Sequence, residues 1–179
     1  MVANAEHDWK FDHKFSYIHT RMLTLGMHDW TRFFKQAWDN LEPGGWLETS
    51  EVQFPGRRAD AEDQRDSPFI QWGEHVSAGA QVAGIDAAAS EKFTDQLQTQ
   101  GFTNVDRVNV QWPVKPWARG EKSKYLGKLL YRNTLDAVPA IATGVFTKCL
   151  GWDKGQVDAF CKTVIKDVDD KNSHFYYPM

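Results

Sequence analysis

The sequence predicts an α/β fold that contains a parallel sheet. Its most informative segment is an apolar pattern at helical spacing over residues 30–41, which indicates a helix that buries one stripe. Two short runs flank this helix, Phe15–His19 before it and Trp46–Val52 after it, and both have strand-like composition. A strand, a crossover helix and a second strand form one right-handed β-α-β unit with parallel strands.

Both ends of the predicted helix carry local signals. Asp29 comes just before the first apolar residue, where a carboxylate can accept hydrogen bonds from free backbone amides. Pro43 cannot extend a helix, and Gly44 and Gly45 adopt backbone angles that other residues resist. We therefore expect the helix to stop at these three residues and the chain to turn straight into the strand.

Further helices are expected over residues 68–83 and 86–100, and Gly101 is well placed to end the second of them. Residues 103–114 alternate between apolar and polar, which is typical of a strand with one exposed face near a sheet edge. We expect this strand to follow the two helices in the same domain.

The last third of the chain is predicted to be mainly helical. A long helical region contains Pro139, which is expected to kink or split it. Asp153 and Gln156 have the spacing of a capping box, and an unbroken apolar face follows over residues 157–168. This is the clearest helix in the sequence.

Composition excludes several classes of function. The 179 residues are 41% hydrophobic and 25% charged, which is ordinary for a soluble globular protein. The net charge of −3 and the lack of a basic stripe argue against nucleic-acid binding. We find no signal peptide and no apolar run that could cross a membrane, so we expect a cytoplasmic or nuclear protein. The two cysteines and six histidines lack the spacing of metal ligands, so no metal site is expected.

Four segments resemble a known family. Ala5–Trp9 and Phe15–Arg21 are similar to an acidic-tryptophan segment followed by an "FDYIHxR" strand, and Asn40–Glu48 is similar to an "L-x-P-G-G-W-x-E" turn. His174–Pro178 resembles the aromatic segment that leads into that family's last strand. The chain therefore resembles the C-terminal half of class I S-adenosylmethionine-dependent methyltransferases, specifically the fungal LaeA-like group linked to regulation of secondary metabolism.

The resemblance implies an incomplete Rossmann-like class I methyltransferase sheet with flanking helices. Phe15–His19 would be strand 4 of the family, Trp46–Val52 strand 5 and Thr103–Gln111 strand 6. Residues 1–179 would form one partial domain, the substrate-side half. The implied activity is methyl transfer from S-adenosylmethionine to an acceptor that the sequence does not identify.

The sequence also departs from the family pattern. It contains no G-x-G, although the family's cofactor loop has this pattern, and Ser16 stands where the family has aspartate. Met179 is expected to arrive before the final strand can be completed. These departures predict a truncated form with impaired cofactor binding.

Loss of the cofactor-side strands would leave Phe15–His19 as an unpaired apolar edge, which favours association. We therefore expect either poor stability or pairing of this strand with another chain, as in a homo-oligomer. The alternative hypothesis is a non-catalytic interaction module that binds a regulatory protein partner.

The resemblance implies a cofactor-binding set of Glu6, Trp9, His19 and Arg21. Glu6 and Trp9 would flank the adenine, His19 would line the methyl-transfer cleft, and Arg21 would anchor a carboxylate of cofactor or substrate. The residues alone leave another interpretation open for Trp9, which is equally suited to act as a staple for the following helix.

His19 and Arg21 also have structural alternatives. His19 would then cap a loop, and Arg21 would pair with Asp29 or Glu51. Because His19 and Arg21 are separated by one residue, they lie on the same side of an extended segment.

Glu51 and Trp117 are the expected substrate-side residues. Alternation along the strand separates Glu48 from Glu51, so these two carboxylates do not form an acid–base pair in one pocket. The alternative for Glu51 is a charge at the solvated end of the strand. We name no catalytic residue, because methyl transfer depends mainly on alignment and requires no particular residue type.

Overall fold

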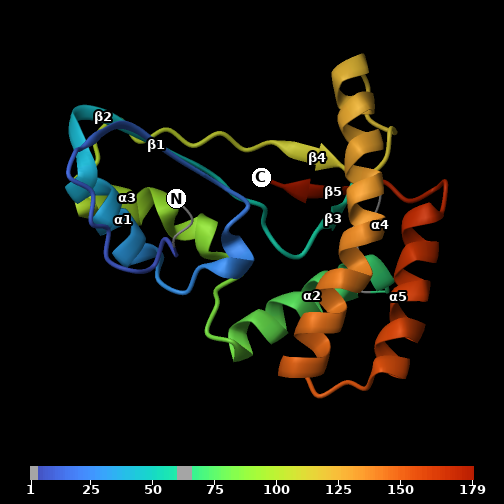
Figure 1. Ribbon diagram of the computed structural model, residues 1–179. Coiled ribbons are helices and arrows are strands. Elements are labelled where there is room, and N and C mark those ends of the chain that lie inside the picture. Colours follow the sequence, from blue (N-terminus) through green and yellow to red (C-terminus); the bar gives the residue numbers. More distant parts are fainter. Residues whose placement is uncertain (1–3, 60–65) are drawn as a thin grey trace. The chain divides into compact units, whose positions relative to one another are not determined.

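A computed structural model describes residues 4–59 and 66–179, which divide between two compact units (Figure 1). The first unit combines the described part of Met1–Val52 with Ile85–Val108. The second unit combines the described part of Gln53–Gly84 with Asn109–Met179. Each unit has its own sheet and its own helices, and we describe them in turn.

The first unit contains the predicted β-α-β arrangement. Strand β1 spans Phe15–Arg21, helix α1 spans Trp30–Asn40, and strand β2 spans Leu41–Ser50. The two strands pair in parallel, which confirms the expected crossover through the helix. The side chain of Asp29 accepts a hydrogen bond from the amide of Arg32, as its position before the helix predicted.

The junction between α1 and β2 lies earlier than expected. The predicted strand began at Trp46, but Leu41 already has extended backbone and pairs with Phe15. The next pair joins Tyr17 to Trp46, so β2 fits extra residues into this stretch and the register is irregular there. Gly44 supplies the necessary left-handed backbone, with a φ of +82°. Pro43 and the glycines therefore belong to the strand.

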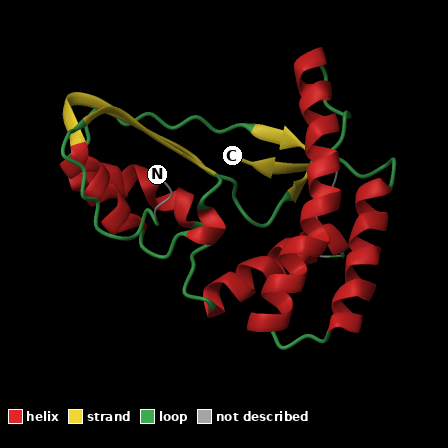
Figure 2. Cartoon of the chain, viewed as in Figure 1, coloured by secondary structure: helices red, strands yellow, loops and turns green. Residues whose placement is uncertain are grey.

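Helices cover one face of the β1–β2 sheet (Figure 2). The short helix η2 spans Ala89–Lys92 and leads into α3, Phe93–Gln100, so only the second half of the helix predicted over residues 86–100 is α-helical. Gly101 ends α3 with a φ of +112°, as expected. Ile18 and Leu47 pack from the sheet against a buried core. That core consists of Met27, Trp30, Phe33, Phe34, Ala37, Ala89 and Phe93.

The second unit has a three-stranded antiparallel sheet. Its central strand β5, Phe175–Pro178, lies between β3, Arg57–Arg58, and β4, Gln111–Pro113. The aromatic segment that was expected only to lead into an unfinished strand therefore forms a strand itself.

Three helices complete the second unit: α2 spans Pro68–Val82, α4 spans Glu121–Cys149 and α5 spans Lys154–Asp169. The capping box of Asp153 and Gln156 is present at the start of α5, as predicted. Fully buried side chains line the interior, namely Phe69, Trp72, Val76, Val138, Phe146, Val157, Val164, Val168 and Phe175. None of the helices in the described part of the chain is long and apolar enough to cross a membrane.

One expectation, for a segment that continues from the first unit into the second, was wrong. The strand predicted over residues 103–114 is reduced to β4, and Val108 is 78% exposed. The reason is that β5 offers a partner only as far as Met179, whose backbone exchanges two hydrogen bonds with Val110. Pro139 does not split the long helix, since α4 runs through it as one element, and the other outcome expected there, a kink, stays a prediction.

Two glycines of α4 provide a matched test of this packing. A Cβ at Gly127 would overlap the backbone carbonyl of Lys115, whereas a Cβ at Gly144 would meet nothing within 4 Å. Gly144→Ala should raise the free energy of unfolding by roughly 0.5–1 kcal/mol, because alanine favours a helix interior. Gly127→Ala should lower it by roughly 1–3 kcal/mol through overpacking. Urea denaturation measures both values, and equal stabilisation by the two variants would contradict the close contact at Lys115.

Candidate functional site

The face of the β1–β2 sheet that lies away from α1 carries a row of polar and aromatic side chains. The parallel register sets Tyr17 beside Trp46 and His19 beside Glu48. Tyr17 is 51% exposed and Trp46 is 66% exposed. Because both strands run in the same direction, their carboxyl ends meet just beyond this row, at Arg21.

Tyr17, His19 and Glu48 form a group of neighbouring side chains, which we call the Tyr–His–Glu cluster. The Tyr17 hydroxyl donates to Oε2 of Glu48 at 2.7 Å, and Nε2 of His19 lies 3.8 Å from Oε1 of Glu48. The rings of Tyr17 and His19 are parallel, with centroids 6.2 Å apart. The hydrogen bond to Glu48 raises the pKa of Tyr17, so the phenol stays a donor at neutral pH.

Glu51 occupies a different environment just past the end of β2. It is only 5% exposed, and its Oε2 accepts from the amides of Leu23 and Thr24, at 2.7 and 2.9 Å. The Thr24 hydroxyl donates to the same oxygen at 2.9 Å. Burial raises the pKa of Glu51, although these hydrogen bonds act in the opposite direction. The Glu51 side chain therefore holds the turn after β1.

That turn contains a strained residue. Met22 has a φ of +59°, a left-handed conformation that is unfavourable for a side chain of this kind, and its amide donates to the Ser50 carbonyl at 3.0 Å. The bonds from Glu51 to the next two residues hold the chain in this conformation. Strain of this type often accompanies a functional position, and here it sets the direction of the backbone after Arg21.

Glu6 and Trp9 lie against α1. Oε1 of Glu6 accepts from the amides of His28 and Asp29, and its Oε2 lies 2.9 Å from Nδ1 of His28. The hydrogen bond with the His28 side chain lowers the pKa of Glu6. The Trp9 indole donates to the Ala5 carbonyl, and its ring packs edge-on against a core phenylalanine. The geometry therefore fits the staple interpretation of Trp9, and contact of either residue with a cofactor stays a prediction.

The other sequence candidates are placed as follows. Both structural partners suggested for Arg21 have other contacts, since Asp29 caps α1 and Glu51 holds the turn. Trp117 belongs to the second unit, where its indole donates to the carbonyl of Phe175 at 3.0 Å. This hydrogen bond helps to hold β5 in place. The substrate-side role of Trp117 stays a prediction.

The pairing of Tyr17 with Glu48 was missed from the sequence. Alternation groups Tyr17 with His19 and Trp46 with Glu48, but it does not say which residues of the two strands lie side by side. That information comes from the register, which the irregular turn at the start of β2 shifts. In residues 4–59 and 66–179, no three His, Cys, Asp or Glu side chains come close enough together to bind a metal ion.

Comparison with known proteins gives consistent matches. Residues 2–107 match the family described as "Methyltransferase domain". The chain is 28% identical over 178 residues to "Probable methyltransferase tdiE" of Emericella nidulans, covering 99% of this chain and 56% of that protein. It is 27% identical over 157 residues to "Methyltransferase pytC" of Aspergillus terreus, covering 88% and 48%.

A regulator also matches. "Secondary metabolism regulator laeA" of Aspergillus flavus is 23% identical over 161 residues, which cover 89% of this chain and 43% of that protein. The chain thus spans about half the length of the curated relatives that it matches.

The buried Glu51 carboxylate makes stability depend on pH. Glu51→Gln keeps an acceptor for the amides of Leu23 and Thr24 but carries no charge. Because the pKa of Glu51 is raised above its ordinary value of 4.5, the folded chain keeps a proton that the unfolded chain has lost. The parent's free energy of unfolding should therefore fall as pH rises from about 4.5 through the folded-state pKa, relative to the Gln variant. Urea denaturation across this range measures the difference, and parallel curves would contradict it.

A second substitution tests the hydrogen bonds themselves. Glu51→Ala leaves two amides of the turn without their acceptor and should cost roughly 1–3 kcal/mol of unfolding free energy. Glu48→Ala removes a carboxylate from the exposed face of the same strand and should change stability by about 0.5 kcal/mol or less. Equal losses in the two variants would show that the Glu51 contacts do not hold the turn.

Proposed function

Because the chain belongs to the methyltransferase-domain family, we propose that it takes part in methyl transfer from S-adenosylmethionine and supplies the acceptor side of the site. The observation that supports this is the position of the Tyr–His–Glu cluster. It lies toward the carboxyl ends of two parallel strands within the matched residues, and in open α/β sheets ligands bind beyond those ends. The fungal relatives further support a role in secondary metabolism.

The Tyr–His–Glu cluster contains a side chain that can take a proton from the methyl acceptor. S-adenosylmethionine, when bound, supplies an electrophilic methyl group on a positively charged sulfur. An acceptor hydroxyl or amine must lose a proton as it is methylated, and His19 is the group placed to take it. Oε1 of Glu48 lies 3.8 Å from Nε2 of His19, on the same face of the sheet. Tyr17 fixes the other oxygen of Glu48 and so orients the carboxylate.

The residues of this chain fit one end of the cofactor. Arg21 is exposed at the end of β1, and its guanidinium suits the carboxylate of the amino-acid end. Oε1 of Glu6 already accepts from the amides of His28 and Asp29, and its Oε2 contacts the His28 ring, so a contact with adenine would require Glu6 to leave these partners. The sequence contains no G-x-G, and we therefore propose that this chain by itself binds the cofactor weakly.

The cofactor contact can be tested by calorimetric titration with S-adenosylhomocysteine. The parent chain should bind saturably, and Arg21→Met should weaken binding about tenfold because one charge-assisted contact is lost. Arg32→Met is the matched control. It removes the same charge from an exposed arginine that pairs with Asp8, and should bind like the parent. No heat from a folded parent, or equal weakening by both variants, would contradict the proposal.

The proton-accepting role can be tested by label transfer from methyl-labelled S-adenosylmethionine to small molecules of a filamentous fungal culture. His19→Gln should lower the rate about a hundredfold, as loss of a general base does, and should leave S-adenosylhomocysteine binding unchanged. His13→Gln changes another exposed histidine, which contacts Asp12, and should transfer label at the parental rate. Full activity in His19→Gln would remove His19 from the mechanism.

A further inference from the structure

The first turns of α4 carry an exposed face that is rich in positive charge. Its residues recur at spacings of three or four, which places them on one side of the helix, and each of them is exposed. Tyr125 is 65% and Leu129 is 52% exposed, so the face also presents two large apolar side chains. We call it the basic face of α4, and it consists of Lys122, Tyr125, Lys128, Leu129 and Arg132.

The packing of α4 fixes the direction in which this face points. On the other side of the helix Gly127 is buried, and a Cβ there would overlap the backbone carbonyl of Lys115. Further along, the Tyr131 hydroxyl donates to Oδ1 of Asp169 in α5 at 2.6 Å. The first turns of α4 extend past β4 and β5 (Figure 1). Turning the basic face inward would therefore break the contacts that hold α4 to its own unit.

The charge of this segment is unbalanced. Residues 119–132 include five basic residues and one acidic residue, which gives a net charge of +4, although the whole chain has a net charge of −3. The acidic residue, Glu121, lies 3.8 Å from Nζ of Lys124, which is not part of the basic face. Within the described residues, the three cations of the basic face form no ion pair. Their charges are therefore not neutralised by neighbouring side chains.

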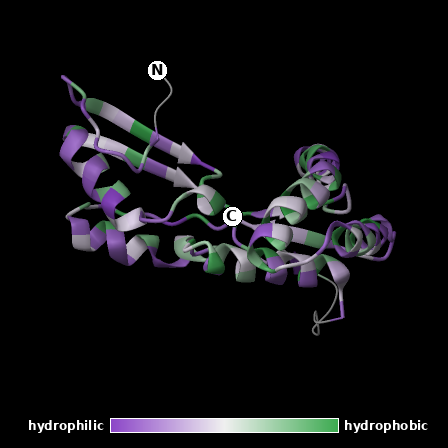
Figure 3. Cartoon of the chain, turned by 60° about the horizontal axis from the view of Figure 1, so that its bottom comes forward, coloured by the Kyte–Doolittle hydropathy of each residue, from purple (hydrophilic) through white to green (hydrophobic). Residues whose placement is uncertain are grey.

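Helix α5 shows that this imbalance is not general. Lys154–Asp169 contains three lysines and three aspartates, and Lys154 pairs with Asp158 at 2.7 Å. The helices of this unit carry both hydrophilic and hydrophobic residues (Figure 3). An ordinary solvated helix mixes charges of both signs, as α5 does. The basic face of α4 instead sets charges of one sign around apolar side chains.

We propose that the basic face of α4 docks an acidic segment of a partner protein, in which hydrophobic side chains alternate with aspartate or glutamate. Carboxylates of the partner pair with Lys122, Lys128 and Arg132, and its hydrophobic side chains cover Tyr125 and Leu129. The face is about 15 Å long, because each residue of a helix adds about 1.5 Å. A segment of about three helical turns is enough to cover it.

Two other anionic surfaces fit this face less well. A helix that lies on an anionic membrane needs a broad apolar face, but the apolar stripe of α4 is buried in its own unit. A nucleic-acid backbone would pair with the cations, but phosphates and sugars offer no apolar contact to Leu129. The net charge of −3 on the whole chain also opposes association with nucleic acid.

Fluorescence anisotropy of a labelled peptide tests the proposal on the full chain. The probe is a peptide of about twelve residues in which leucines alternate with glutamates at helical spacing. The parent should bind it at low salt with a dissociation constant below about 100 μM. Lys128→Glu/Arg132→Glu should raise this constant at least about tenfold and reduce its dependence on salt, because the attraction between opposite charges is lost.

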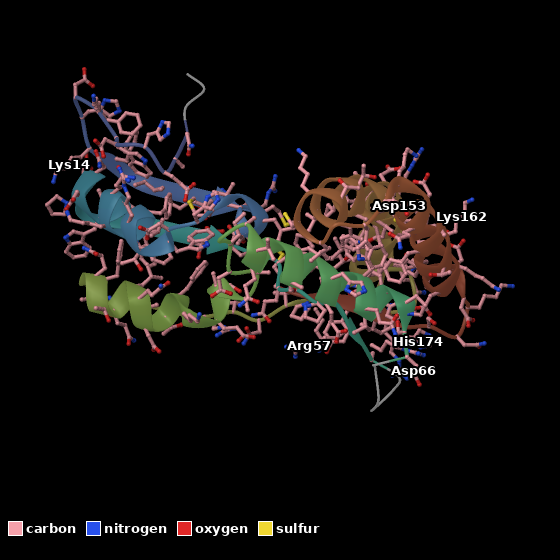
Figure 4. All side chains as sticks on the ribbon, turned by 90° about the horizontal axis from the view of Figure 1, so that it is seen from below. Lys14, Arg57, Asp66, Asp153, Lys162 and His174 are labelled. Carbon is pink, nitrogen blue, oxygen red and sulfur yellow. The ribbon has the colours of Figure 1, made fainter. Side chains whose placement is uncertain are left out.

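Lys162→Glu/Lys166→Glu is the matched control. It makes the same change of charge at the same spacing in the same unit, on α5, where Lys162 lies on the outside of the helix (Figure 4). This variant should bind the peptide like the parent. Circular dichroism and urea denaturation check that both variants stay folded, as expected for exposed positions.

A third variant tests the apolar part of the face. Tyr125→Ala/Leu129→Ala should weaken binding about tenfold and leave its salt dependence unchanged, because only apolar contact is lost. The proposal is independent of methyl transfer, in which none of these residues has a role.

Four outcomes would overturn the proposal. The first is no binding of the acidic peptide by the folded parent. The second is equal binding of a neutral peptide in which glutamine replaces each glutamate. The third is equal weakening by the two charge-reversed variants. The fourth is tighter binding of the parent to single-stranded DNA or to phosphatidylserine vesicles than to the acidic peptide, which would assign the face to nucleic acid or to a membrane surface.

Discussion

The parallel pairing of β1 with β2 is the constraint on which the candidate site depends. Parallel strands cannot be joined by a tight turn, so α1 must carry the chain back across the sheet. The crossover buries the apolar stripe of α1 against one face, which leaves the opposite face for polar side chains. The same pairing brings Glu48 of β2 beside His19 of β1, residues that are far apart in the sequence. The Tyr–His–Glu cluster therefore depends on the packing of α1 against the other face of the sheet.

Glu51 connects this site to the stability of the fold. Its carboxylate is removed from water, which is unfavourable for a charge, and the turn after β1 compensates with two amides and a hydroxyl. This turn also keeps Met22 in a left-handed backbone conformation, which is unfavourable for a residue with a side chain. The direction of the chain beyond Arg21 is thus set by a contact with the other strand. Stability and the geometry at the carboxyl ends of the strands have a common origin here.

The failure of the strand predicted over residues 103–114 has a simple physical cause. Alternation describes which side chains share a face, but a strand also needs a neighbour for its backbone groups. β5 provides that neighbour only for the last few residues, and Val108, which is not part of a strand, has an exposed side chain. By contrast, the aromatic run before Met179 pairs on both sides and forms the centre of its sheet.

The sequence by itself determined the elements whose causes are local. The apolar stripe of α1, the cap at Asp29, the capping box at Asp153 and the stop at Gly101 all depend on residues within a turn or two of one another. Only the tertiary structure decided that Tyr17 and His19 share Glu48, and that Glu51 is buried under a turn instead of ending a strand in water. The reason is that register and burial depend on segments distant in the chain, and periodicity within one segment carries no information about them.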